Sequence, residues 1–398
     1  MPTAGLYAFP SDLVDEGPAQ VARAAADLGA DALVLALAYH QARDLVPHAG
    51  DKPVVRYRDD AVFVAASRWW EGLRLRPQEG PDLERAAVAE LLALADRPAV
   101  EAWTVFCHNT SLGRAVTDVA SRTCFGDRLY SNLCPANPDV VAYACALASA
   151  VVAQGVDVVA EALSAQTFAH GHHHERSFTP LGDLDEAILG LCFCDACSAR
   201  AQGRGADVPR LAHAAQAHLR LAFAGRIGGP ASPEALADAL GPDVLTLMDC
   251  RRDAVTGLAA AVTAVVRSGG RRLSYMDLTG AVLGYADGLP TGAEAGSQAW
   301  RLSIDPAAVG SVVDSYTVLG YASDPERLAA DVASVRAAVG PLPLTVILRP
   351  GWPDTTSPAH LADKVAAARE GGADRVDFYN YGMYDAAVLA RIPGALRI

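Results

Sequence analysis

Eight short apolar runs, most of them followed by a helical pattern, constrain the fold of this chain more than any other feature. The runs are Gly5–Pro10, Asp31–His40, Val100–Asn109, Val156–Glu161, Arg272–Leu278, Ser311–Tyr321, Leu344–Pro350 and Arg375–Tyr381. Continuous apolar runs of this length are typical of parallel strands that are buried on both faces. Eight strands that alternate with helices predict an α/β protein with a single (β/α)8 TIM barrel.

The rival architecture is a doubly wound open sheet, but no Gly-x-Gly-x-x-Gly motif opens a helix after the first run. The sequence also shows no internal repeat, no coiled coil and no linker long enough to divide it. We therefore expect one domain over residues 1–398, with long insertions after the third and fourth strands. The second insertion is a His- and Cys-rich helical region at about 162–270.

Composition excludes several classes of partner. The net charge of −13 argues against nucleic acid and anionic membranes, because both require a basic face. The start of the chain has no basic and apolar pattern typical of a secretory signal, and the longest apolar stretches are too short to span a bilayer. We expect a cytoplasmic protein, in which eight cysteines are thiols or metal ligands rather than disulfides. The oligomeric state is not readable from the sequence.

Polar and aromatic side chains gather where the predicted strands end. In a parallel barrel these ends share one mouth, where catalytic and binding groups lie. The two carboxylates among them are Glu161 and Asp277. The other residues that we expect to bind substrate there are Tyr39, His40, His108, Asn109, Tyr321, Arg349, Trp352, Asn380 and Tyr381.

This set suits a carbohydrate, because sugar hydroxyls need polar partners and the C–H face of the ring needs a flat apolar platform. Cleavage of a glycosidic bond requires one protonated acid and one ionised carboxylate. We therefore predict a glycoside hydrolase-like enzyme that acts on a small glycoside, with Glu161 as general acid/base and Asp277 as the second carboxylate. Each residue also has a structural interpretation: Glu161 could cap a loop or pair with an arginine, and Asp277 could hold Arg271 or Arg272.

A histidine cluster follows Glu161 in the sequence. It comprises His170, His172, His173, His174 and Glu175. These side chains could contact sugar hydroxyls, and we name His172 and His174 for that role, or they could pack the loop. They could also bind a catalytic divalent metal, which would make the protein a metal-dependent sugar isomerase or epimerase that uses Glu161 and Asp277 as ligands. A third alternative is a catalytically inactive sugar-binding barrel.

A cysteine cluster follows the histidines. Cys192, Cys194 and Cys197 form a C-x-C-x-x-C motif whose thiolates can converge on one tetrahedral Zn²⁺, and Cys134 is the best candidate for the fourth ligand. A redox pair of thiols and an unoccupied, reduced cluster are the competing interpretations. We predict structural zinc and no organic cofactor.

The stretch Cys134–Tyr143 (CPANPDVVAY), with the helix, acid-ended strand and C-x-C-x-x-C motif that follow, resembles the zinc-binding segment of glycoside hydrolase family 42 β-galactosidases. The resemblance implies that Cys134, Cys192, Cys194 and Cys197 are the four zinc ligands. The wider stretch, with the closing Phe-Tyr-Asn-Tyr-Gly, is similar to uncharacterised bacterial glycoside-hydrolase-like barrels. The matching motifs cover about a fifth of the chain, and only Glu161 carries over as a catalytic residue. Clan-A glycosidases have Asn-Glu at the end of the fourth strand and a nucleophilic Glu at the end of the seventh, where this chain has Ala160-Glu161 and Leu348-Arg349.

Overall fold

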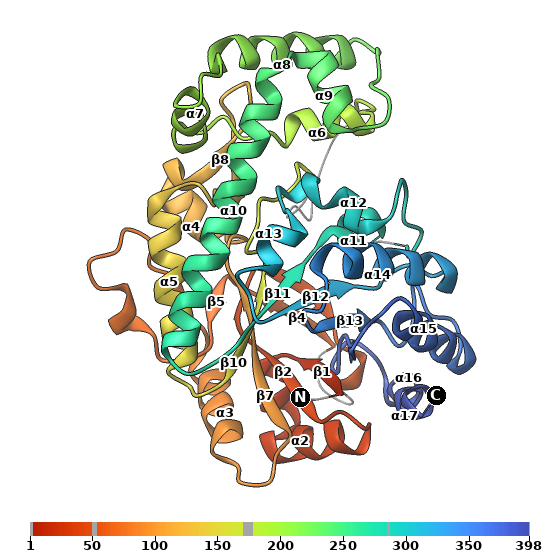
Figure 1. The fold of residues 1–398 in the computed structure, drawn as a ribbon. Coiled ribbons are helices and arrows are strands. Elements are labelled where there is room, and N and C mark those ends of the chain that lie inside the picture. The colour runs from red at the N-terminus through yellow and green to blue at the C-terminus, as the bar shows by residue number, and fades with distance from the viewer. Residues whose placement is uncertain (1–2, 50–53, 170–177, 285–286, 398) are drawn as a thin grey trace.

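Eight parallel strands close into a barrel in the computed structural model, which describes residues 3–49, 54–169, 178–284 and 287–397 (Figure 1). The first strand pairs with the second and also with the last, which closes the barrel. The strands are β1 (Ala4–Ala8), β2 (Ala32–Tyr39), β7 (Ala99–Val105), β10 (Asp157–Glu161), β11 (Leu273–Asp277), β12 (Ser315–Leu319), β13 (Leu344–Leu348) and β14 (Arg375–Phe378). The eight-stranded parallel barrel predicted from the apolar runs is confirmed, although most strands are shorter than the runs.

Helices between the strands form the outer layer, and local sequence sets where several of them begin. The helices are α1 (Pro10–Glu16), α2 (Pro18–Asp27), α3 (Asp82–Ala93), α5 (Pro138–Val152), α10 (Asp243–Ser268), α13 (Pro306–Gly310), α14 (Pro325–Val339), α15 (Pro358–Glu370), α16 (Ala386–Leu389) and α17 (Ile392–Leu396). Asn137, Asp324 and Ser357 cap α5, α14 and α15, each accepting a hydrogen bond from a backbone N–H of the first turn. A proline follows each cap at the first helical position, where its missing N–H costs nothing.

Additional elements interrupt this alternation after four strands. After β2 come β3 (Ala42–Leu45), β4 (Val55–Arg58), β5 (Ala61–Val62) and β6 (Gln78–Glu79). After β7 come α4 (Thr110–Ala115), β8 (Ala120–Arg122) and β9 (Arg128–Leu133). After β10 come α6 (Asp183–Leu189), α7 (Asp195–Gln202), α8 (Val208–Phe223) and α9 (Pro233–Leu240), which we call the inserted helices, and then α10. After β11 come two further short helices, α11 (Thr279–Gly284) and α12 (Ala295–Gln298).

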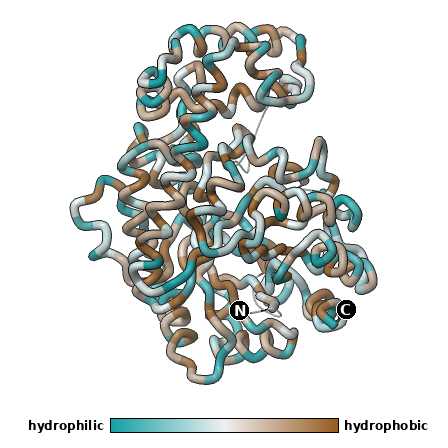
Figure 2. The backbone as a smooth tube through the Cα atoms, in the orientation of Figure 1, coloured by the Kyte–Doolittle hydropathy of each residue, from teal (hydrophilic) through white to brown (hydrophobic). Residues whose placement is uncertain are grey.

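Helix α10 belongs to two hydrophobic cores. Residues in its first half, such as Val244 and Leu247, pack with the inserted helices, whereas Leu258 and Val262 in its second half pack with the barrel. Figure 1 shows α10 running from the inserted helices down the side of the barrel, and Figure 2 shows apolar stretches in both regions. Helix α10 is 26 residues long. None of the described helices combines the length and apolar character that a membrane crossing requires.

Candidate active site

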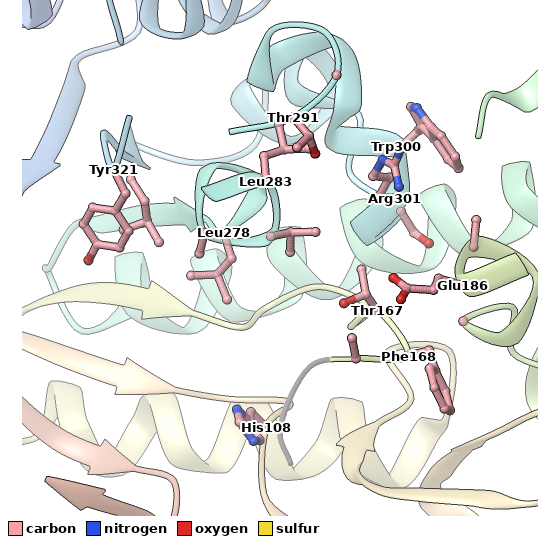
Figure 3. A pocket seen from close by; sticks show the side chains of 18 of the residues that line it. His108, Thr167, Phe168, Glu186, Leu278, Leu283, Thr291, Trp300, Arg301 and Tyr321 are labelled. Atoms are coloured by element: carbon pink, nitrogen blue, oxygen red, sulfur yellow. The ribbon is translucent and has the colours of Figure 1, made fainter. Parts of the chain in front are cut away.

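A cavity of about 920 Å³ opens at the carboxyl ends of the strands and extends to the inserted helices (Figure 3). Strands β14, β1, β2, β7 and β10 and the residues directly after them form one side, which we call the polar half. Its lining residues are Tyr7, Tyr39, His40, Trp103, His108, Glu161 and Tyr379. Another side, which we call the apolar half, is formed by strands β11–β13, helix α11 and Leu278, which connects β11 to α11. Its lining residues are Met276, Leu278, Ala281, Val282, Leu283, Leu319 and Ile347.

Glu161 is the carboxyl group of the polar half. It is the last residue of β10, only 8% of it is exposed, and the indole Nε1 of Trp103 donates a 2.5 Å hydrogen bond to its Oε2. Burial raises the pKa of Glu161 to about 7, and the hydrogen bond from Trp103 opposes that shift only in part. No cation pairs with Glu161 among the described residues. A carboxyl group with this pKa can hold and release a proton near neutral pH, as a general acid/base must.

The backbone directly after Glu161 is unusual. Ala162 is fully buried and has a φ of 52°, in the left-handed region that residues with a Cβ rarely adopt. Hydrogen bonds fix the turn on both sides of the peptide, since Phe106 N donates to Glu161 O and Cys107 N donates to Ala162 O, both at 3.0 Å. Strained backbone of this kind concentrates at functional sites.

Aromatic rings surround the Glu161 carboxyl group. Trp103 meets Tyr7, Tyr39 and Tyr379 edge to face, with centroid distances of 5.2, 4.6 and 5.7 Å. The Tyr7 hydroxyl group is buried and has no hydrogen-bond partner among the described residues. A buried hydroxyl group without a partner is costly, and the residue that carries this one lines the cavity.

Two histidines complete the polar half. The rings of His40 and His108 stack with centroids 4.2 Å apart, and Tyr39 stacks on the other side of His40 at the same distance. Gln41 O lies 2.9 Å from His40 Nδ1. Both histidines line the cavity, and imidazole nitrogens can donate to or accept from sugar hydroxyls.

Asp277 is not brought to this cavity. Its Oδ1 accepts hydrogen bonds from the backbone N–H and hydroxyl group of Thr279, and its Oδ2 accepts one from the hydroxyl group of Tyr316. It lines a separate small space between the barrel and α14. Burial raises its pKa, and these hydrogen bonds oppose the shift. The physical reason is the alternation of side chains along β11, which turns Met276 toward the large cavity and Asp277 away from it.

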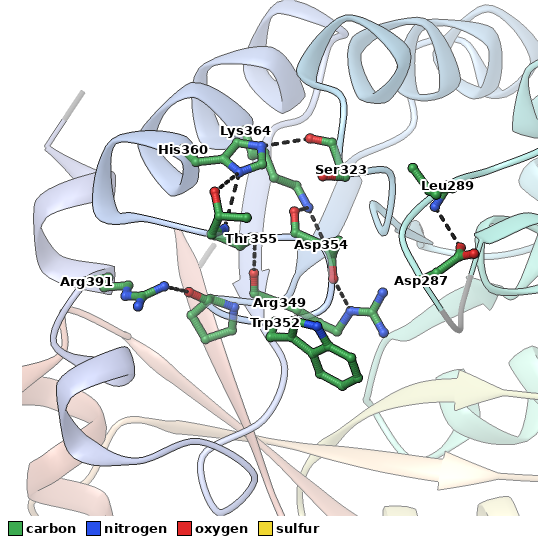
Figure 4. A network of polar contacts seen from close by, with 12 residues as sticks. Asp287, Leu289, Ser323, Arg349, Trp352, Asp354, Thr355, His360, Lys364 and Arg391 are labelled. Atoms are coloured by element: carbon green, nitrogen blue, oxygen red, sulfur yellow. Dashed lines mark hydrogen bonds and ion pairs between the residues drawn. The ribbon is translucent and has the colours of Figure 1, made fainter.

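Arg349 also lies outside the cavity lining, in a buried charge network behind the apolar half (Figure 4). Asp354 accepts hydrogen bonds from Arg349 Nε and from Lys364 Nζ, and all three side chains are buried. The guanidinium carbon of Arg349 lies 4.1 Å from the ring centroid of Tyr321, which does line the cavity. Arg349 therefore does not line the cavity itself but makes a cation–π contact with Tyr321, which does.

The remaining residues expected at the mouth have local roles. Asn109 caps α4 by accepting a hydrogen bond from Leu112 N, and Asn380 Oδ1 accepts one from Gly382 N. The Tyr381 hydroxyl group donates to Glu16, and Trp352 is 81% exposed. None of Asn109, Trp352, Asn380 and Tyr381 is among the described residues that line the cavity. His172 and His174, with the rest of the histidine cluster, lie outside the described residues.

The inserted helices supply the third side of the cavity. Asp183 accepts two hydrogen bonds of 2.6 Å from the guanidinium group of Arg301, a bidentate pair that fixes both side chains. Glu186, one turn further along α6, also lines the cavity, as do Phe168 and Trp300 (Figure 3). Glu161, Asp183 and Glu186 are the carboxylates among the described lining residues.

Sequence reasoning missed several residues of the site. Tyr7 and Trp103 lie within strands rather than at their ends. Asp183, Glu186 and Arg301 belong to elements outside the barrel strands, and the sequence does not tell where those elements pack. One signal was present: a Trp or Tyr inside an otherwise apolar strand carries a polar atom that needs a partner. Both Tyr7 and Trp103 line this cavity.

A separate cluster holds four buried cysteines between the barrel and the inserted helices. The Sγ atoms of Cys134, Cys192, Cys194 and Cys197 all lie within 4.8 Å of one another. Cys134 Sγ lies 3.5 Å from those of Cys194 and Cys197 and 4.0 Å from that of Cys192. A zinc ion with four Zn–S bonds of about 2.3 Å would separate its sulfur ligands by about 3.8 Å. The four thiols are therefore spaced to hold one metal ion.

Searches by sequence find neither a family model nor a curated protein that matches this chain. Searches by structure find glycosidases. β-Galactosidase from the psychrophilic Marinomonas ef1 matches with a TM-score of 0.55 and 12% identity over 99% of this chain and 59% of its own. β-Galactosidase from Bacillus circulans sp. alkalophilus matches with a TM-score of 0.54 and 13% identity over 100% of this chain and 55% of its own.

The catalytic domain of β-amylase from Paenibacillus polymyxa matches with a TM-score of 0.52 and 10% identity, over 99% of this chain and 97% of that domain. This chain spans little more than half the length of the two β-galactosidases. At identities this low the likeness shows a fold shared with glycoside hydrolases, and function has to be argued from the site.

Proposed function

We propose that this protein cleaves the glycosidic bond of a small glycoside, with Glu161 as the general acid/base. The observation that carries the proposal is a buried carboxyl group with a pKa of about 7 at the carboxyl end of a barrel strand, in the wall of the main cavity. A leaving group oxygen needs a proton as its bond to the sugar breaks, and a carboxylic acid that is still protonated near neutral pH can supply it. The fold shared with glycosidases supports the same conclusion.

Substrate binding would fall to the polar half. The sugar ring would pack on Trp103 and the histidine stack, with Tyr7, His40 and His108 as hydrogen-bonding partners for its hydroxyl groups. Water is displaced from a site of this kind when substrate binds, which strengthens the hydrogen bonds that remain. Tyr39 and Tyr321, both expected from the sequence to bind substrate, line the same cavity.

The second carboxylate of the mechanism is open to direct test. Asp277 was expected in that role, but its hydrogen bonds to Thr279 and Tyr316 hold it outside the cavity. Asp183, which pairs with Arg301, and Glu186 are the other carboxylates among the described lining residues. If Glu186 activates the water, Glu186→Gln should lower the hydrolysis rate while Asp277→Asn should chiefly lower stability.

The test of the proposal is a panel of nitrophenyl glycosides assayed with and without EDTA. Hydrolysis that is insensitive to EDTA and is lost in Glu161→Gln supports a carboxylate mechanism. Turnover of free sugars that EDTA abolishes would instead indicate the metal-dependent isomerase or epimerase, a class for which the described residues offer no joint site of Glu161 and Asp277. No turnover of any glycoside or free sugar would overturn the proposal.

A catalytically inactive sugar-binding barrel is the second candidate, and one observation favours it. The apolar half contributes no carboxylate to the cavity among the described residues, so a nucleophile facing Glu161 from β13 is not present there. Binding of sugars without turnover, measured by titration calorimetry with the same panel, would select this candidate.

We also propose that the four clustered cysteines bind one structural zinc ion, because they are buried and their Sγ atoms all lie within 4.8 Å of one another. The backbone N–H of Arg122 lies 3.5 Å from Cys192 Sγ, a contact that suits a thiolate. Purified protein should contain about one zinc per chain, and Cys194→Ser should lose the metal and lower the melting temperature, since the binding free energy is partly folding free energy. Cys145→Ser, outside the cluster, is the matched control. Metal-free protein prepared under reducing conditions would contradict the proposal.

A further inference from the structure

The apolar half of the cavity offers side chains of one kind. Its seven lining residues are Met276, Leu278, Ala281, Val282, Leu283, Leu319 and Ile347, and none has a polar side chain. Tyr321, two residues beyond β12, and Thr291 are the polar residues that flank it. Figure 3 shows Leu278 and Leu283 on this side, with Glu186 and Phe168 on another.

Backbone carbonyl groups of this wall already accept hydrogen bonds from other backbone groups. The carbonyl oxygen of Leu278 accepts hydrogen bonds from Ala281 N and Val282 N, and that of Leu283 accepts one from Thr291 N. A ligand in contact with the wall therefore meets mainly hydrocarbon. A sugar placed here would lose water from its hydroxyl groups without gaining partners, which is unfavourable, whereas an apolar group would gain from burial.

Close packing fixes the wall in place. Gly280 in α11 lies so near the end of β12 that a Cβ at this position would sit 2.2 Å from the carbonyl oxygen of Leu319. Only a residue without a side chain allows α11 to approach the strand this closely. The wall is thus held against the barrel, and it faces the same space as the polar half that carries Glu161.

The size of the cavity allows a ligand to touch both halves. About 920 Å³ lies at the upper end of the range of small-molecule sites, which is typically 300–1,000 Å³. A single sugar against the polar half would leave the apolar wall exposed to water. A larger ligand with one polar and one apolar part would cover both.

We propose that the apolar half is a subsite for the aglycone, and that the substrates are glycosides whose aglycone is an apolar ring or chain rather than a second sugar. This inference rests on the proposed function, since it takes Glu161 to protonate the oxygen that joins sugar and aglycone. Water then adds to the anomeric carbon, so that the products are the free sugar and the aglycone alcohol or phenol, and atoms and charge balance without a further reactant.

The experiment compares two glycosides of one sugar, a 2-naphthyl glycoside and a disaccharide with glucose as leaving group. Wild-type protein should have the higher kcat/KM for the naphthyl glycoside. Leu283→Ser should lower that value about tenfold and lower the value for the disaccharide much less, because a glucose leaving group gains little from apolar contact. Leu283→Met, which keeps the apolar volume, should restore most of the loss. Leu289→Ser is the matched control, since Leu289 is 66% exposed and outside the cavity lining.

Failure of the inference and failure of the proposed function give different results. Hydrolysis of both glycosides with an equal loss in Leu283→Ser, or a preference of the wild type for the disaccharide, overturns the aglycone subsite alone. Absence of hydrolysis overturns the proposed function, and the subsite is then tested by fluorescence titration with free 2-naphthol. Binding that Leu283→Ser weakens about tenfold and Leu289→Ser does not supports the subsite, and binding that neither changes, or no binding, overturns it.

Discussion

The two halves of the barrel mouth differ in how their buried carboxyl groups are paired. In the polar half, Glu161 is buried without a cation among the described residues, and the hydrogen bond to its carboxyl group comes from a neutral indole. Behind the apolar half, Asp354 is held between Arg349 and Lys364. Burying an ionised group is costly unless it is paired, so burial favours the protonated form of an unpaired carboxyl group such as that of Glu161. Glu161 is therefore suited to proton transfer, whereas the Arg349, Asp354 and Lys364 network stabilises the structure behind the apolar half.

Glu161→Gln should produce the largest effect on the polar half. The variant keeps an oxygen for the Trp103 hydrogen bond but cannot deliver a proton, so the rate on a glycoside with a poor leaving group should fall by about 10²–10⁴-fold. Cleavage of a glycoside with an activated leaving group, which needs no protonation, should suffer much less. Steady-state kinetics with both substrates measure the difference. Equal loss on the two substrates would show that the acid lies elsewhere, and loss of folding would show that Glu161 is structural.

Behind the apolar half, Asp354→Ala is the variant to compare with Glu161→Gln, and it should lower stability rather than the reaction rate. Two buried cations would lose their partner, and the free energy of unfolding should fall by about 3–5 kcal/mol in urea denaturation. Asp363→Ala, at an exposed position of α15, the helix that carries Lys364, should stay within about 0.5 kcal/mol of the wild type. If folded Asp354→Ala lost its rate as severely as Glu161→Gln, the two halves would not differ in the way proposed.

The pH dependence should follow the raised pKa of Glu161. The acid form is the active one, so the rate on a poor leaving group should fall about tenfold per pH unit above about 7. In the unfolded chain this group ionises near 4.5, so between about pH 4.5 and 7 the folded state binds more protons than the unfolded state. Stability relative to Glu161→Gln should therefore decrease as the pH rises through this window. A parallel pair of stability profiles would contradict the assignment.

Tyr7→Phe should give the smallest effect, and one that distinguishes binding from structure. Its hydroxyl group lacks a partner among the described residues, so its removal should leave the free energy of unfolding unchanged or raise it by up to about 1 kcal/mol. If the group meets substrate, kcat/KM should fall about three- to tenfold at the same time. A loss of stability with unchanged kinetics would assign the hydroxyl group a structural role.

Sequence alone was sufficient for the barrel, because buried parallel strands are recognisable as apolar runs. It was also sufficient to place Glu161 at a strand end. It could not decide which way a strand-end side chain points, since a shift of one residue turns it to the opposite face. Glu161 and Asp277 both end strands, yet one lines the cavity and the other bonds to Tyr316 outside it. Contacts between distant elements, such as Asp183 with Arg301, follow only from the folded chain.

Helix α10 limits how this protein could be re-engineered. Loops of a barrel can often be exchanged between scaffolds because each is anchored at two neighbouring points. Here the inserted helices share α10 with the barrel, so a cut that removed them would leave Val244 and Leu247 as an apolar stripe with no covering layer. A cut within α10 would take away part of the barrel's own outer layer, including Leu258. The inserted helices therefore cannot be deleted without exposing apolar surface, and a minimal version of this barrel would need a redesigned α10 surface.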